Sequence, residues 1–359
     1  MTIYLPDRIV DILTVQKRDE EIRSYDHEQL ESFIALSEKY SCSGILLFQS
    51  NSGNIDPWVF AQVVMSTSSS LCPFIAVNPV YMHPLSAAQK ILSLSSYYKR
   101  KIYINYIIGT SKSDLASIND NLDHEERYER LTEYIKIVTG LLRSDVLLSF
   151  SGKYFIVQNL RLPARLPGEM LPEIFVAGSS ENARRVRGMF NAISLQMAKG
   201  TDGLQERDLL EPEKKGLHFG VITRETGTEA IKRFSELFTV SEEGQALLNY
   251  SLLNTDARWK RQMFSGMEEG GQSDNTYSMA AFANFKSDCP YHVGSYREIA
   301  EAVVKYVING VSTIVIEIPG DGIEFEHISR AFNLAKKMLL ENYYVEPKFS
   351  DYESRENIS

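Results

Sequence analysis

A short polar segment, Gly178–Ser180, could bind a phosphate group. It follows the apolar run Glu173–Ala177, which predicts a strand, and precedes Asn182–Arg184, which predicts the start of a helix. Backbone N–H groups and the positive end of the helix dipole attract anions there, and the hydroxyls of Ser179 and Ser180 add donors. Either serine could instead do no more than cap the helix. The pattern leaves phosphate binding and helix capping open.

Three further polar residues, Asn78, Asn105 and Glu317, each lie at or near the end of an apolar run that predicts a strand. In a parallel barrel these positions meet at the end where active sites form. Either asparagine could contact a ligand or pair with loop backbone. Glu317 could act as a base, hold an amine or form an ordinary ion pair. The residues by themselves do not decide between these roles.

The elements that must position these residues follow a repeated pattern of short apolar runs separated by helical segments. Continuous apolar strands between helices indicate a parallel sheet covered on both faces. Five or more such units along the whole chain favour a closed (β/α)8 barrel over an open sheet. The runs are Ile45–Phe48, Phe74–Val77, Ile102–Ile108, Glu173–Ala177, Asn191–Leu195 and Thr313–Glu317.

Two segments interrupt this pattern. Residues 146–159 predict a hairpin around Ser151–Lys153. Residues 265–290 are polar and contain glycines, which predicts a mobile loop or lid.

Composition limits the possible partners and the compartment. The 359 residues carry 38 Lys+Arg against 47 Asp+Glu, a net charge of −9, which argues against nucleic acid or an anionic membrane as the main partner. No apolar run approaches the ~18 residues of a membrane span. The three cysteines are odd in number and lack metal-ligand spacing, which is typical of a reduced cytoplasm. We therefore expect a cytoplasmic protein without a metal.

Several segments, in order, resemble the bacterial-luciferase-like flavin-dependent monooxygenases, especially their alkanesulfonate monooxygenase branch. The resemblance covers nearly the whole chain. It implies one (β/α)8 barrel domain over residues 1–345, with insertions at about 146–159 and 240–290 and a polar tail at 346–359. The matching segments are Asn105 with Gly109, Leu122–Arg130, Phe150–Phe155, Leu171–Ser180, Gly220–Thr226 and Val293–Tyr296.

The resemblance also implies a cofactor site. In the family, the turn matching Gly178–Ser180 and the tyrosine matching Tyr128 hold the FMN phosphate, and the asparagine matching Asn105 contacts the flavin ring. Asn78 is a weaker candidate of the same kind. The alternative for Tyr128 is a place in the core, on a helix that Asp123–Glu126 begins as a capping box.

Departures from the alkanesulfonate branch concern the substrate. Asn54 replaces that branch's cysteine, and His218 stands where the branch has an arginine, in the strand that follows the insertion. Its tyrosine and histidine after the last strand give way to Glu317–Asp321, and Lys286 is the nearest cation to its missing loop arginine. A sulfonate needs fixed cations to replace its lost water, so an alkanesulfonate is not the expected substrate. Asn54, His218 and Glu317 become the candidate catalytic residues.

The leading hypothesis is a two-component monooxygenase, active as a homodimer or homotetramer. A separate NAD(P)H-dependent flavin reductase would supply reduced FMN, which with O2 would oxidise a small organic substrate. The chain's lack of a Gly-x-Gly-x-x-Gly fingerprint agrees with a flavin supplied from outside. The alternatives are a non-catalytic paralogue acting as a partner subunit and a deazaflavin-dependent oxidoreductase.

Overall fold

The computed structural model describes residues 1–16, 27–48, 51, 55–201, 214–239, 241–257, 260–261, 263–264, 276–319 and 321–344. Asn54 and the expected tail at 346–359 lie outside the described residues.

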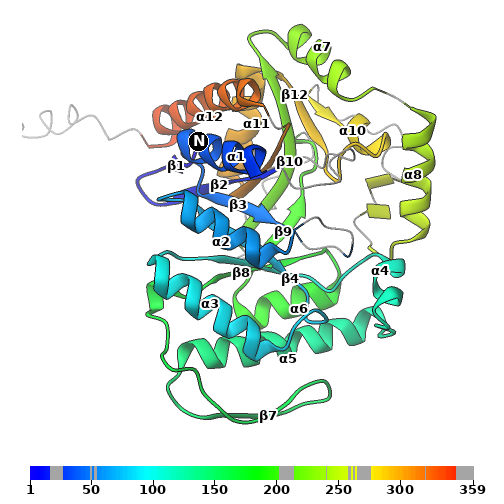
Figure 1. The fold of residues 1–359 in the computed structure, drawn as a ribbon. Helices are drawn as coiled ribbons and strands as arrows, with labels where there is room; N and C mark the ends of the chain where they lie inside the picture. The colour runs from blue at the N-terminus through cyan, green and yellow to red at the C-terminus, as the bar shows by residue number, and fades with distance from the viewer. Residues whose placement is uncertain are drawn as a thin grey trace, which may run out of the picture.

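Eight parallel strands close into a barrel, as predicted (Figure 1). The barrel closes because the last strand pairs with both the seventh and the first. All six predicted runs contribute a strand. In order around the barrel, the strands are β2 (Ile9–Gln16), β3 (Gly44–Leu47), β4 (Cys72–Val77), β5 (Tyr103–Tyr106), β8 (Glu173–Ala177), β9 (Ile193–Met197), β10 (Lys215–Arg224) and β13 (Val311–Ile318).

Helices surround the strands, and the chain supplies their caps. Asp123 and Glu126 form the predicted capping box at the start of α5, and His83 caps α3 through its Nδ1. The major helices are α1 (His27–Lys39), α2 (Pro57–Thr67), α3 (Pro84–Tyr98), α5 (His124–Arg143), α6 (Glu181–Phe190), α11 (Tyr296–Ile308) and α12 (Gly322–Tyr343). The shorter or peripheral elements are β1 (Ile3–Tyr4), α4 (Lys112–Ser117), η1 (Gly168–Met170), α7 (Gly227–Leu237) and α8 (Glu242–Leu253).

The barrel interior is a packed apolar core. Successive strand residues point alternately inward and outward, and the inward set forms a cluster separate from the larger core between strands and helices. Because side chains fill the barrel, a ligand site must lie at one of its ends. The inward set is Leu13, Val15, Leu46, Phe74, Tyr103, Phe175, Ile193, Leu195 and Val315.

The predicted hairpin is confirmed as the antiparallel pair β6 (Leu148–Ser151) and β7 (Ile156–Leu160). It extends beyond α5 at the bottom of Figure 1. The carboxylate of Glu133 on α5 accepts hydrogen bonds from the backbone N–H groups of Lys153, Tyr154 and Phe155, which holds the turn against the helix.

The predicted loop at 265–290 is partly wrong. Residues 265–275 lie outside the described part of the chain, but the rest contains β11 (Tyr277–Ser278) and α10 (Ala280–Ala283). They lead into β12 (Tyr291–Ser295), which pairs with the carboxyl-terminal half of β10, Gly220–Arg224. In Figure 1 these elements gather with α7 and α8 at one side of the barrel. The apolar stretch Ala280–Ala283 is too short to predict a helix from the sequence, because polar residues surround it.

Within the described residues, no helix combines the length and apolar character needed to cross a membrane.

Candidate functional site

Polar side chains converge at the carboxyl-terminal end of the barrel. Asn105 lies two residues beyond the inward-facing Tyr103, and Glu317 lies two residues beyond the inward-facing Val315. His218 pairs directly with Val315 across β10 and β13. Because side chains two residues apart, or opposite in register, share a face, all three point into the barrel. The structure thus places three predicted site residues at the end where barrel enzymes carry their active sites.

The predicted phosphate turn lies against Tyr128. Gly178 has a φ of +106°, and a Cβ there would lie 2.9 Å from Tyr128 Oη, so glycine alone fits this position. Tyr128 is buried, and its hydroxyl donates to the Ala177 carbonyl at 3.4 Å. Burial raises the pKa of Tyr128, so the hydroxyl remains a donor at neutral pH. Although Tyr128 packs in the core, its polar atom reaches the turn.

Ser180 has the capping role that the sequence left open. Its Oγ accepts a hydrogen bond from the Ala183 N–H at 3.2 Å, at the first turn of α6. The buried Arg187 donates to the Gly178 carbonyl at 2.9 Å and holds the turn in place. Capping does not exclude phosphate binding, because the other backbone N–H groups of the first turn remain directed away from the helix.

The two asparagines differ. Asn78 Oδ1 accepts a hydrogen bond from the Val80 N–H at 3.3 Å, which matches the alternative of a side chain pairing with loop backbone. Asn105 is 6% exposed, and its Oδ1 has no hydrogen-bond partner within the described part of the chain. A buried acceptor without a partner costs free energy. Asn105 is therefore the stronger candidate for contacting a ligand.

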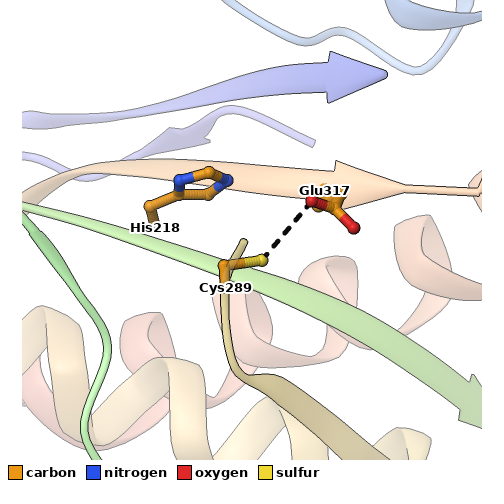
Figure 2. A group of neighbouring side chains, drawn as sticks. All are labelled: His218, Cys289 and Glu317. Atoms are coloured by element: carbon orange, nitrogen blue, oxygen red, sulfur yellow. Dashed lines mark hydrogen bonds between the residues drawn. The ribbon is translucent and has the colours of Figure 1, made fainter. Parts of the chain in front are cut away.

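On the other side of the barrel mouth, His218 and Glu317 meet a residue that the sequence did not single out, Cys289. One polar atom from each of the three side chains lies within 4.8 Å of the other two. Figure 2 shows them arriving from separate elements: β10, β13 and the loop before β12. The Cys289 thiol donates to Glu317 Oε2 at 3.7 Å. Cys289 is distant along the chain from both partners, so no spacing in the sequence could reveal it.

Tyr291 completes this cluster. Its hydroxyl donates to Glu317 Oε1 at 2.7 Å. In the sheet, Gly220 of β10 pairs with Tyr291 on one side and with Glu317 on the other. A Cβ at Gly220 would lie 2.2 Å from the Tyr291 ring, so the phenol crosses over β10 at this glycine to reach the carboxylate.

The protonation states follow from burial. Desolvation lowers the pKa of His218 to about 4, although the nearby Asp288 opposes the shift. Burial, and then the charge of Glu317, raise the pKa of the Cys289 thiol and of the Tyr291 hydroxyl. At neutral pH the cluster therefore holds a neutral imidazole, a thiol and a phenol beside the Glu317 side chain. His218 Nε2 is buried and has no hydrogen-bond partner among the described residues.

Comparison with known proteins identifies the family. Residues 14–313 match the family model described as luciferase-like monooxygenase. The 4-(γ-L-glutamylamino)butanoyl-[BtrI acyl-carrier protein] monooxygenase BtrO of Niallia circulans is 28% identical over 301 residues, which cover 82% of this chain and 87% of that protein.

Two solved structures share the fold. The riboflavin lyase RcaE, solved with modified FMN and riboflavin, has a TM-score of 0.72 at 16% identity and covers 89% of this chain and 90% of its own. The EDTA monooxygenase EmoA of Chelativorans sp. BNC1 has a TM-score of 0.72 at 15% identity, over 91% of this chain and 94% of its own. These matches do not single out the alkanesulfonate branch. The chain is an oxidoreductase that belongs to the luciferase-like monooxygenase family.

Proposed function

We propose that this protein is the oxygenating component of a two-component system. It would bind reduced FMN from a separate NAD(P)H-dependent flavin reductase and use O2 to oxidise a small organic substrate. The observation that carries the proposal is the juxtaposition of Tyr128 with Gly178–Ser180 at the start of α6. The barrel beside it contains Asn105 Oδ1, which has no partner in the described part of the chain.

The residues present fit FMN at two points. The turn offers backbone N–H groups, the serine hydroxyls and the Tyr128 hydroxyl, which together suit a phosphate dianion. Asn105 Oδ1 offers an acceptor inside the barrel, which suits a ring N–H of the flavin. When bound, reduced FMN supplies the reaction with O2, and the protein contributes binding, orientation and exclusion of water.

On the substrate side, the chain offers acceptors. Glu317 offers carboxyl oxygens, and the neutral His218 has a ring nitrogen with no partner among the residues that the structure describes. These groups can bind N–H or O–H donors of a substrate or take up a proton during its oxidation. Neither group is a fixed cation, so neither could replace the water around a sulfonate. The substrate of the Niallia relative, by its name, is an amide-containing acyl group on a carrier protein. A substrate with N–H donors would likewise suit the acceptors of His218 and Glu317.

An anaerobic flavin titration tests the proposal. Purified protein is titrated separately with reduced FMN, oxidised FMN and a reduced deazaflavin, and binding is followed by fluorescence. We expect reduced FMN to bind most tightly. Tighter binding of the deazaflavin would favour the deazaflavin-dependent alternative, and no binding of any flavin would refute the proposal.

A second assay addresses the substrate. Enzyme, reductase, NAD(P)H and FMN are incubated aerobically with alkanesulfonates of several lengths. We expect no sulfite above the level of a control without enzyme. Sulfite release at steady turnover would show that the loss of the branch's cations does not exclude an alkanesulfonate substrate.

A further inference from the structure

The Cys289 thiol has no role in the proposed flavin chemistry, although it lies beside two other side chains that can bind a metal ion, His218 and Glu317. We propose that His218, Cys289 and Glu317 form a binding site for one divalent transition-metal ion, with Zn²⁺ the ion that suits the donors best (Figure 2). This inference does not depend on flavin binding.

The geometry is close to that of a bound site. The three ligand atoms lie within 4.8 Å of one another, and two ligands of a tetrahedral zinc ion are about 3–4 Å apart, given metal–ligand bonds of about 2.0–2.3 Å. The distance of 3.7 Å between Cys289 Sγ and Glu317 Oε2 already lies in this range. The strands β10 and β13 pair directly beside the site, so the backbone under two of the ligands is held by the barrel itself.

The buried imidazole supplies independent support. His218 Nε2 is buried without a hydrogen-bond partner within the described part of the chain. Such an atom is costly unless something else occupies its lone pair. Imidazole nitrogen is the commonest metal ligand in proteins.

The charges balance when the metal binds. The Cys289 thiol loses one proton to solvent as the sulfur–metal bond forms, and Glu317 binds in its carboxylate form. One thiolate and one carboxylate neutralise a dication, so the buried site carries no net charge. Oxidation states do not change, and no other reactant is needed.

The surroundings resemble a supporting shell for a metal ligand. Tyr291 donates to Glu317 Oε1 at 2.7 Å, which orients the carboxylate and leaves Oε2 directed toward Cys289. Three protein ligands leave a fourth tetrahedral position for water or a substrate oxygen, as in catalytic rather than structural zinc sites. That position would open at the end of the barrel where the substrate enters.

Metal titration of the full-length protein tests the site. Protein stripped with a chelator and kept reduced is titrated with Co²⁺, followed by absorbance, and with Zn²⁺, followed by calorimetry in two buffers of different ionisation enthalpy. We expect one ion per chain, a thiolate-to-cobalt charge-transfer band, and release of one proton per ion. Less than stoichiometric binding, or binding without the thiolate band, would overturn the proposal.

Variants separate this site from the other cysteines. Cys289→Ser should abolish the thiolate band and weaken metal binding by at least about tenfold. Mutation of a residue that only hydrogen-bonds to a metal ligand already lowers metal affinity by about 10–100-fold. Glu317→Gln should weaken binding but keep the band. The matched control Cys72→Ser, at a free half-buried cysteine on β4, should change neither. Thermal unfolding shows whether each variant is folded. If Cys289→Ser does not fold, the metal affinity of Glu317→Gln decides the test. Unchanged metal affinity in Glu317→Gln would also overturn the proposal.

Discussion

Polar side chains at the two ends of the barrel interior differ in their hydrogen-bond partners. At the amino-terminal end, Asp11 accepts hydrogen bonds from Ser43 at 2.7 Å and from Tyr103 at 3.2 Å. Glu173 pairs there with Lys101 at 3.1 Å. At the carboxyl-terminal end, Asn105 Oδ1 and His218 Nε2 have no partner among the described residues.

This contrast separates structural from functional polarity. Groups that partner one another contribute to the stability of the fold without a ligand. Groups without partners make the fold less stable than it could be, and that cost is expected where a ligand completes the hydrogen bonds. Changes at the carboxyl-terminal end should therefore alter binding, and changes at the amino-terminal end should alter stability.

The largest effect is expected from Ser180→Asp. Aspartate caps a helix as well as serine does, so stability should stay within about 0.5 kcal/mol of wild type. Its charge would face the FMN phosphate and weaken binding by about 1–3 kcal/mol, or roughly 5- to 150-fold in Kd. Flavin titration and thermal unfolding measure both quantities. Ser295→Asp, at the N-cap of α11, is the matched control and should bind FMN normally; unchanged affinity in Ser180→Asp would move the phosphate elsewhere.

A smaller effect is expected from Asn105→Leu. The variant removes Asn105 Oδ1, which has no hydrogen-bond partner among the described residues. The free energy of unfolding of the variant should therefore be no lower than that of wild type. Affinity for reduced FMN should fall about tenfold through loss of one hydrogen bond. Denaturant unfolding and titration of the same preparation make the comparison. A variant that is less stable and binds FMN normally would place Asn105 among the structural groups.

Asp11→Asn should change stability in a pH-dependent way. Burial raises the pKa of Asp11, against hydrogen bonds from Ser43 and Tyr103 that lower it. Above the unfolded pKa of about 4, the folded wild type binds more protons than the unfolded chain, so it loses stability as pH rises. The asparagine variant has no such loss. Its melting temperature relative to wild type should therefore increase between pH 4 and pH 7; a constant difference would contradict this.

The smallest effect is expected from Lys101→Met. The Lys101–Glu173 ion pair is partly exposed at 35% and 24%, and such pairs contribute less than about 1 kcal/mol. Melting temperature should fall slightly, by less in high salt, and flavin affinity should not change. A large loss of flavin binding would show that the two ends of the barrel are coupled.

The sequence predicted the barrel, the hairpin and the turn at Gly178–Ser180 between a strand and a helix, because each depends on residues close along the chain. Strand runs such as Phe74–Val77 and the capping box at Asp123 are local signals that tertiary contacts do not override. Glu317 and His218 were named separately, but their meeting depends on the pairing of β10 with β13. Cys289 had no local signal, because its partners come from other strands. The role of Asn54 stays a prediction.

The residue at position 220 indicates whether a related chain can form the contact between Tyr291 and Glu317. The Tyr291 phenol reaches Glu317 only by crossing the backbone at this residue, where a Cβ would lie 2.2 Å from the ring. Any larger residue at this position would displace the ring from the carboxylate. These three positions should consequently covary during evolution. A relative that carries alanine or a larger residue in place of Gly220 has lost the phenol–carboxylate contact, even where its tyrosine and glutamate are both retained.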